Sequence, residues 1–271
     1  MTSLQNKNAV VYGAGGSLGG AVAKALAAAG ARVFLTGHRT ASVQITAAEI
    51  AAAGGTAEVD LVDAFDEAAV DTHLAEVVYK TGHLDISFNA VDIKVVQNIA
   101  LVDISVDDFV RTIAQTMQTR FLTARAAAKV MMKQHSGVIL SLTATPGGIS
   151  YPYTGNFAPA CCAVECLSQN LAAELGIYGI RVVNIRSGGS PDSRVFKEAI
   201  DHDPVGMEPI LRSMKADTML KRLPLMADIA NTAVFLASDL AGGITGVTID
   251  VTCGTSAGLN YKVSSPTFSS R

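Results

Sequence analysis

The sequence has little net charge and no long apolar run, and both shortages narrow the range of functions. Its formal net charge of −3 over 271 residues gives no sign of a nucleic-acid or anionic-membrane partner. No apolar run approaches the ~20 residues that a membrane span requires. The polar residues 1–7 lead directly into the first apolar run, without the pattern of a signal peptide. We therefore expect a cytoplasmic protein that acts on a small molecule, with neither membrane nor nucleic acid as a partner.

Cysteine and histidine are also scarce. The four cysteines form no C-x-x-C pair and have no histidine at metal-ligand spacing; they are Cys161, Cys162, Cys166 and Cys253. We expect no metal site, and we interpret the cysteines as free thiols in a reducing cytoplasm. The five histidines (38, 73, 83, 135 and 202) have no partner at catalytic spacing, so we expect none of them to be catalytic.

Glycine, in contrast, is concentrated in a turn near the start of the sequence that indicates the fold. Residues 8–39, NAVVYGAGGSLGGAVAKALAAAGARVFLTGHR, follow the order strand, glycine turn, helix, strand. A glycine turn at the start of a helix leaves free backbone N–H groups at the positive end of the helix dipole. This context predicts a pyrophosphate site in a dinucleotide-binding fold.

The rest of the chain repeats the alternation of strand and helix. Apolar runs predict strands at 9–12, 32–36, 56–60, 84–89, 137–142, 180–186 and 247–251. Amphipathic patterns predict helices between them, including 42–53, 64–81, 105–135, 155–178 and 226–238. We expect a single doubly wound α/β Rossmann fold, with an about seven-stranded parallel sheet and helices on both faces. Its expected extent is 1–258, including a substrate lid at 187–223, followed by a polar C-terminal tail at 259–271.

Several segments resemble the short-chain dehydrogenase/reductase family, and the resemblance covers residues 5–258. They are DLVD at 60–63, LDISFNA at 84–90, GIRVVN at 179–184, LKRLP at 220–224, IANTAVFLASD at 229–239 and ITG at 244–246. The resemblance implies the Rossmann fold and a nicotinamide dinucleotide. It also implies a homotetramer or dimer that pairs through the helices at 105–135 and 155–178. It does not specify the reaction.

The family's glycine motif is T-G-x-x-x-G-x-G, and residues 12–19 read YGAGGSLG, so Ser17 replaces the middle glycine. Serine suits a helix N-cap, and its hydroxyl can donate to a phosphate oxygen. In the family, the first aspartate of the segment at 60–63 meets the adenine amino group. The cofactor-binding residues that the resemblance implies are Gly13, Ser17, Leu18, Gly19, Asp60, Leu61, Asn89, Ala90 and Gly188.

The end of the second strand selects between the two nicotinamide cofactors. An acid there would hold the ribose 2′-hydroxyl and repel a 2′-phosphate. This chain has Gly37-His38-Arg39 and no acid. Arg39, with His38 beside it, favours NADP(H) over NAD(H) through charge-assisted hydrogen bonds. Two alternatives remain: Arg39 is a solvated surface residue, or the fold is retained without any dinucleotide.

The catalytic residues of the family are missing. Family members use an Asn, a Ser, a Tyr and a Lys four residues after the Tyr, in which the Tyr donates a proton and the Lys lowers its pKa. The corresponding residues here are Thr116, Ala144, Phe157 and Cys161, and no lysine lies between Lys133 and Lys197. Loss of a general acid costs ~10²–10⁴ in rate, so ordinary ketone reduction by the family mechanism is not expected.

Other residues are candidates to replace them. Tyr151 and Tyr153 precede Phe157 and can offer a phenol, and Thr143 and Thr145 can offer a hydroxyl. Cys161 shares a helix face with Phe157, and Arg186 is a candidate to lower the pKa of its thiol. The alternatives are that the tyrosine rings pack on their loop, that the threonine hydroxyls bond the backbone, and that Cys161 is a small buried residue.

Residues 187–223 contain many apolar side chains at helical spacing, among them Val195, Phe196, Ile200, Met207 and Met214. They predict a flexible apolar lid that suits an apolar or acyl-like ligand, or else a segment packed on the sheet edge. Three functions stay open. The first is an NADP(H)-binding oxidoreductase with a non-standard site for a carbonyl or an activated C=C. The second is a non-catalytic relative that binds a dinucleotide or ligand and assembles with an active relative. The third is a non-redox enzyme that uses Cys161.

Overall fold

The computed structural model describes residues 3–257, and the expected tail at 259–271 lies outside them. Its centre is one sheet of parallel strands: β1 Asn8–Tyr12, β2 Arg32–Gly37, β3 Thr56–Leu61, β4 Ile86–Asn89, β5 Gly137–Ala144, β6 Ile180–Ser187 and β7 Thr248–Val251. The seven strands lie in the order β3-β2-β1-β4-β5-β6-β7. The expected seven-stranded parallel sheet is therefore confirmed. The strand order reverses between β1 and β4, which is the point where such sheets bind ligands.

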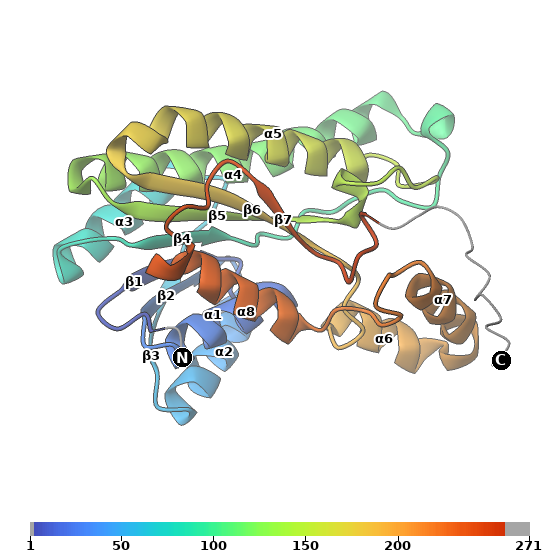
Figure 1. The fold of residues 1–271 in the computed structure, drawn as a ribbon, viewed down its shortest axis with the longest axis horizontal. Coiled ribbons are helices and arrows are strands. Elements are labelled where there is room, and N and C mark those ends of the chain that lie inside the picture. The colour runs from blue at the N-terminus through green and yellow to red at the C-terminus, as the bar shows by residue number, and fades with distance from the viewer. Residues whose placement is uncertain (1–2, 258–271) are drawn as a thin grey trace, which may run out of the picture.

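Helices cover both faces of the sheet (Figure 1). They are α1 Ser17–Ala28, α2 Thr40–Ala52, α3 Glu67–Thr81, α4 Val106–Gln134, α5 Phe157–Leu175, α6 Arg194–His202, α7 Pro204–Ala216 and α8 Met226–Ala237. One face carries α1, α2 and α8, and the opposite face carries α3, α4 and α5. This is the doubly wound arrangement that the alternation of patterns predicts.

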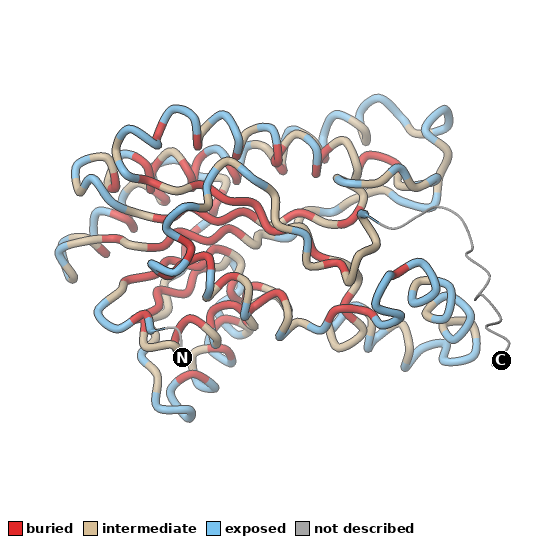
Figure 2. Tube along the Cα trace, viewed as in Figure 1, coloured by how far each residue is buried: buried red, intermediate tan, exposed pale blue. Residues whose placement is uncertain are grey.

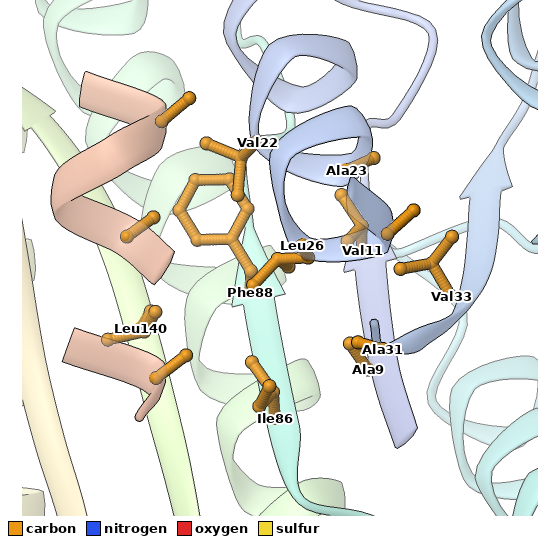
Figure 3. Close-up of a cluster of buried hydrophobic side chains, with 14 of the residues drawn as sticks. Ala9, Val11, Val22, Ala23, Leu26, Ala31, Val33, Ile86, Phe88 and Leu140 are labelled. Atoms are coloured by element: carbon orange, nitrogen blue, oxygen red, sulfur yellow. The ribbon is translucent and has the colours of Figure 1, made fainter. Parts of the chain in front are cut away.

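The core has one layer on each face of the sheet. Between the sheet and α1 and α8, alanine and valine let the helices approach closely, and Phe88 of β4 fills the space between them (Figure 3). A second layer lies between the sheet and α3, α4 and α5, and includes Tyr12, Phe34 and Met131. Every residue of β1 is buried, because both of its faces are covered (Figure 2).

Helix ends follow from local chemistry. The Asp66 carboxylate accepts hydrogen bonds from the backbone N–H groups of Ala68 and Ala69, which starts α3. The Ser105 hydroxyl accepts from Asp108 N at 3.1 Å, which starts α4 as the sequence predicts. α4 ends at His135, which adopts the left-handed conformation with φ 54°.

The segment expected to be a lid stands apart from the sheet (Figures 1 and 2). It forms α6 and α7, and neither helix contains a buried residue. Phe196 and Met214 lie close to the backbone of Gly189, where an added Cβ would lie 2.9 Å and 2.6 Å from their side-chain atoms. Neither α6 nor α7 therefore contributes a buried residue to the core, as the alternative of packing on the sheet edge would require.

Candidate active site

A cavity of about 540 Å³ opens at the carboxyl ends of β1, β2, β4 and β5. It extends from the glycine turn and the end of β2, across the β1/β4 reversal, to α4 and α5. The start of the lid also lines it, through Ser193, Arg194 and Val195. A second hollow of about 490 Å³ beside β7 is lined by residues such as Asp228 and Asp250, and by none of the predicted site residues.

The glycine turn at one end of this cavity has no room for side chains. Gly13 has φ 77°, and an added Cβ would lie 2.6 Å from Ala90 O. A Cβ on Gly19 would collide with Gly13 O. The N-cap of α1 is Gly16, which has no side chain to satisfy the first N–H groups of the helix. These N–H groups therefore stay available to an anion in the cavity.

Ser17 is not the N-cap that the sequence suggests. Gly16 holds the extended conformation of the cap, and Ser17 is already the first helical residue. Its hydroxyl accepts a hydrogen bond from the backbone N–H of Arg194 at 3.0 Å. Ser17 thus links the glycine turn to the start of the lid, and it still lines the cavity together with Gly13, Leu18 and Gly19.

His38 and Arg39 follow β2, and both are exposed side chains that line the cavity. Asp60, the acid expected beside the adenine, does not line the cavity. β3 continues to Leu61, so Asp60 is still within the strand, where its carboxylate lies 3.3 Å from Nε2 of buried His73. Neither Asp60 nor Leu61 lines the cavity, whereas Val62 and Asp63, which follow the strand, do. Of the two aspartates in the segment at 60–63, Asp63 is therefore the one that lines the cavity, which Asp92 also lines.

Two other expected cofactor residues have structural contacts instead. The Asn89 amide donates to Thr119 O at 3.1 Å and to Thr123 Oγ1 at 2.9 Å, which fixes the end of β4 to α4. Gly188 packs against Pro224. Neither residue lines the cavity, but the residue beside each of them, Ala90 and Ser187, does.

The four residues that the sequence resemblance aligns with the family's catalytic positions come together at the other end of the cavity. Thr116 lies on α4, Ala144 at the end of β5, and Phe157 and Cys161 on the first turns of α5, and all four line the same cavity. Cys161 is 4% exposed, and burial raises the pKa of its thiol to about 11. A thiol with this pKa is neutral near pH 7, so this cluster contains no ready thiolate.

The residues expected to assist them are engaged elsewhere. Arg186 pairs with Glu165 and Asp250, with Nε 3.0 Å from Glu165 Oε1, so Arg186 is not the cation beside Cys161. The Thr143 hydroxyl donates to Glu165, and the Thr145 hydroxyl donates to Ser187 O.

The tyrosines do not reach the cavity in this structure. Tyr153 is 62% exposed, and burial raises the pKa of Tyr151, which is half-buried. Neither is among the residues that line the cavity. A role for either phenol as a substitute acid stays a prediction, and it requires the loop before α5 to move.

Arg120 is the functional candidate that the sequence reading missed. It lies on α4 one turn after Thr116, is 8% exposed, and lines the cavity close to Cys161. Helical spacing places Arg120 on the same buried face of α4 as Thr116, Thr123 and Ala127. An arginine on a buried helix face is a sequence signal for a functional residue, and a search for family motifs does not detect it.

Among residues 3–257, no group of three or more histidine, cysteine or acidic side chains is arranged to hold a metal ion. Within the same range, no helix is long and apolar enough to cross a membrane. All four cysteines are free.

Comparisons with known proteins identify relatives among oxidoreductases. L-rhamnose 1-dehydrogenase (NAD(P)(+)) of Sphingomonas sp. (strain SKA58) is 29% identical over 251 residues, which are 92% of this chain and 96% of that protein. The 3-oxoacyl-(acyl-carrier-protein) reductase of Synechocystis sp. (strain ATCC 27184 / PCC 6803 / Kazusa) is 29% identical over 253 residues, 93% of this chain and 97% of that protein.

Among solved structures, levodione reductase superposes with a TM-score of 0.86 and covers 94% of this chain and 99% of its own. Its 24% sequence identity makes this a likeness of fold alone. Residues 13–256 match the family model described as enoyl-(acyl carrier protein) reductase. The chain therefore belongs to the short-chain dehydrogenase/reductase family of oxidoreductases.

Proposed function

We propose that the protein is an NADP(H)-binding oxidoreductase with a non-standard active site, which acts on a small apolar or acyl-like carbonyl or on an activated C=C. The observation that carries this proposal is the single cavity that joins the glycine turn and Arg39 to Phe157 and Cys161. The relatives named above are a dehydrogenase and a reductase, which supports redox chemistry for this chain as well.

The residues of the cavity fit a dinucleotide. Gly13 and Gly19 have no room for a Cβ atom, so backbone N–H groups of the turn are able to approach a pyrophosphate closely. Arg39 and His38 offer positive charge and donors for a 2′-phosphate at one end. Bound at this site, the nicotinamide cofactor would supply the hydride. The protein supplies binding and orientation.

The other end of the cavity favours a substrate that needs little help from an acid. Phe157 and Ala144 present an apolar wall where the family uses a phenol and a hydroxyl, and the Cys161 thiol has its pKa raised to about 11. Reduction of an activated C=C suits such a site, because water is able to supply the proton. Apolar residues at the start of the lid, such as Val195, favour an apolar or acyl-like compound over a sugar.

A second candidate is a non-catalytic member of the family that binds a dinucleotide and assembles with an active relative. The observation that favours it is the substitution of all four catalytic positions in a cavity that is otherwise intact. The third candidate, a non-redox enzyme that uses the Cys161 thiol, is weakened by the raised pKa of that thiol.

We further propose a homo-oligomer, a tetramer or a dimer, paired through α4 and α5. Phe121 on α4 is 44% exposed and Val110 is 53% exposed, which leaves apolar surface on the outer side of this helix. Static light scattering at micromolar concentration should give a dimer or a tetramer, and a monomer would contradict this proposal. A cytoplasmic location is supported by the four free thiols.

Titration with NADPH and NADH, followed by nicotinamide fluorescence, tests the cofactor. NADPH should bind more tightly, and Arg39→Ala should remove the preference while the control Arg212→Ala, an exposed arginine of α7, should keep it. The native protein with NADPH should then reduce an activated enone faster than a simple ketone. If neither cofactor binds up to millimolar concentration, the proposed function is wrong. If NADPH binds but no hydride is transferred to any substrate of either class, the non-catalytic candidate replaces it.

A further inference from the structure

Arg120 is a buried cation with incomplete partners. Its Nη1 donates to Val91 O at 2.9 Å and to Thr119 Oγ1 at 3.1 Å. Its Nε is buried and has no hydrogen-bond partner in the structure. Within residues 3–257, Arg120 forms no ion pair. A guanidinium has five N–H donors in a planar fork, so several remain for a ligand.

No carboxylate of the described residues pairs directly with the charge of Arg120. Burial lowers the pKa of the guanidinium to about 10, while Cys161 and Asp92 act on it in the opposite direction. The group therefore remains charged at neutral pH. A buried charge that forms no ion pair is costly to the folded protein. A ligand that brings acceptor oxygens into the cavity would relieve that cost.

The strand order fixes which end of a dinucleotide Arg120 faces. Arg39 follows β2, on one side of β1, whereas Arg120 contacts the segment after β4, on the other side. A dinucleotide that crosses the β1/β4 reversal therefore has its 2′-phosphoadenosine half toward Arg39 and its nicotinamide half toward Arg120. Cys161, the residue at the family's lysine position, lines the same end of the cavity.

We propose that Arg120, reaching in from α4, supplies the positive charge and hydrogen-bond donors that a lysine at position 161 of α5 would otherwise supply, and binds the nicotinamide-ribose half of the cofactor. This inference rests on the proposed NADP(H) site. Arg120 and Cys161 line the same cavity, close enough for their charges to interact, and the unused donors of Arg120 suit the hydroxyl oxygens of a ribose. The same charge disfavours the cationic nicotinamide ring of NADP⁺ relative to the neutral ring of NADPH.

A purely structural role is the competing explanation. The bond from Arg120 Nη1 to Val91 O holds the segment after β4, and Arg120 could serve only as this clamp. The two roles differ in what a neutral substitution does. Loss of a clamp loosens the cavity and weakens every ligand. Loss of a ribose-binding charge weakens only ligands that carry the nicotinamide half.

The test compares NADPH, NADP⁺ and adenosine 2′,5′-bisphosphate, which lacks the nicotinamide half, by isothermal titration calorimetry. Arg120→Met should weaken NADPH ~10–100-fold, the range for hydrogen bonds to a charged group, and leave the bisphosphate within about threefold. The preference of NADPH over NADP⁺ should fall about tenfold with the same substitution. Arg120→Lys should retain most of the NADPH affinity, and Arg120→Gln repeats the test if Arg120→Met does not fold.

Two matched substitutions complete the experiment. Arg125→Met removes an arginine of α4 that pairs with Glu67 outside the cavity, and it should leave all three affinities unchanged. Arg39→Ala should weaken NADPH and the bisphosphate together. The proposed role of Arg120 is wrong if Arg120→Met leaves the ratio of NADPH affinity to bisphosphate affinity unchanged. It is also wrong if Arg120→Lys and Arg120→Met lose equal affinity for NADPH. If the native protein binds none of the three ligands, the proposed function fails instead.

Discussion

Restoring the family's catalytic residues should not restore ketone reduction unless Arg120 is replaced as well. Ala144→Ser, Phe157→Tyr and Cys161→Lys together restore the hydroxyl, the proton donor and the lysine that supports it. In this fold, however, the introduced lysine would face the guanidinium of Arg120, which lines the same end of the cavity. We predict that the triple variant gains less than tenfold in ketone reduction with NADPH, and that adding Arg120→Leu raises the gain to at least 100-fold.

The magnitudes come from two opposing effects. A restored general acid contributes ~10²–10⁴ in rate, roughly 3–5 kcal/mol of barrier. Two like charges about 4–6 Å apart repel by about 3–4 kcal/mol at an effective dielectric constant of 20. This repulsion drives the introduced lysine and Arg120 apart, so neither cation is held beside the new phenol, where it would lower the pKa of that phenol. The two effects are of similar size, and the triple variant should therefore gain little.

The assay is NADPH oxidation followed by absorbance with a fixed panel of simple ketones. The single variant Arg120→Leu serves as the control, because it lacks the phenol and should stay at the native level. If the triple variant is as active as the fourfold variant, Arg120 does not act on position 161 and our reasoning is wrong. If the native protein already reduces simple ketones at an ordinary ~10 per second, a substitute acid operates, and Tyr151 or Tyr153 would have to reach the cavity.

Other outcomes concern groups around the site. Arg186→Met leaves the Glu165 carboxylate, which is 9% exposed, without its 3.0 Å partner. The free energy of unfolding in urea should then fall by about 3–5 kcal/mol, and an unchanged midpoint would contradict the pairing. Burial lowers the pKa of His73 below its ordinary 6.5, so below pH 6.5 the unfolded chain binds the extra proton first. Stability should therefore decline as pH falls, and His73→Gln should flatten this decline in thermal melts. Cys161→Ala should leave any hydride transfer intact because the thiol is neutral, whereas loss of all activity would favour the non-redox enzyme.

The fold was predictable because its signals are local and repeated. The apolar run of β1 stops at Gly13, and only a residue without Cβ fits beside Ala90 O at that point. The glycine at position 13 therefore predicts both the turn and the edge of the cavity from the sequence alone. The capping residue Ser105 likewise marks the start of α4. Such signals need no knowledge of which segments meet in space.

The site was predictable only where it depends on single positions within a motif. The residues aligned with the catalytic positions line one cavity, because similar sequence on both sides fixes their register on β5 and α5. Asp60 does not line it, because one or two residues at the end of β3 decide whether a side chain belongs to the strand or to the loop that reaches the cavity. Arg120 was missed because its importance comes from the approach of α4 to α5 and from the lack of an ion pair among the described residues, neither of which a linear pattern records.

The presence of Arg120 as a buried cation in the cavity bears on which function the chain has. A cavity that no longer receives any polar ligand gains stability when its charged residues are replaced by apolar ones, because an uncompensated buried charge opposes folding. Here the proton donor and the lysine are absent from α5, yet Arg120 remains charged, partly unpaired and directed at the same cavity. This combination favours a site that still binds a polar ligand, and it disfavours an empty remnant. The oxidoreductase and the non-catalytic dinucleotide-binding protein both meet this condition, so hydride transfer, and not cofactor binding, is the property that separates them.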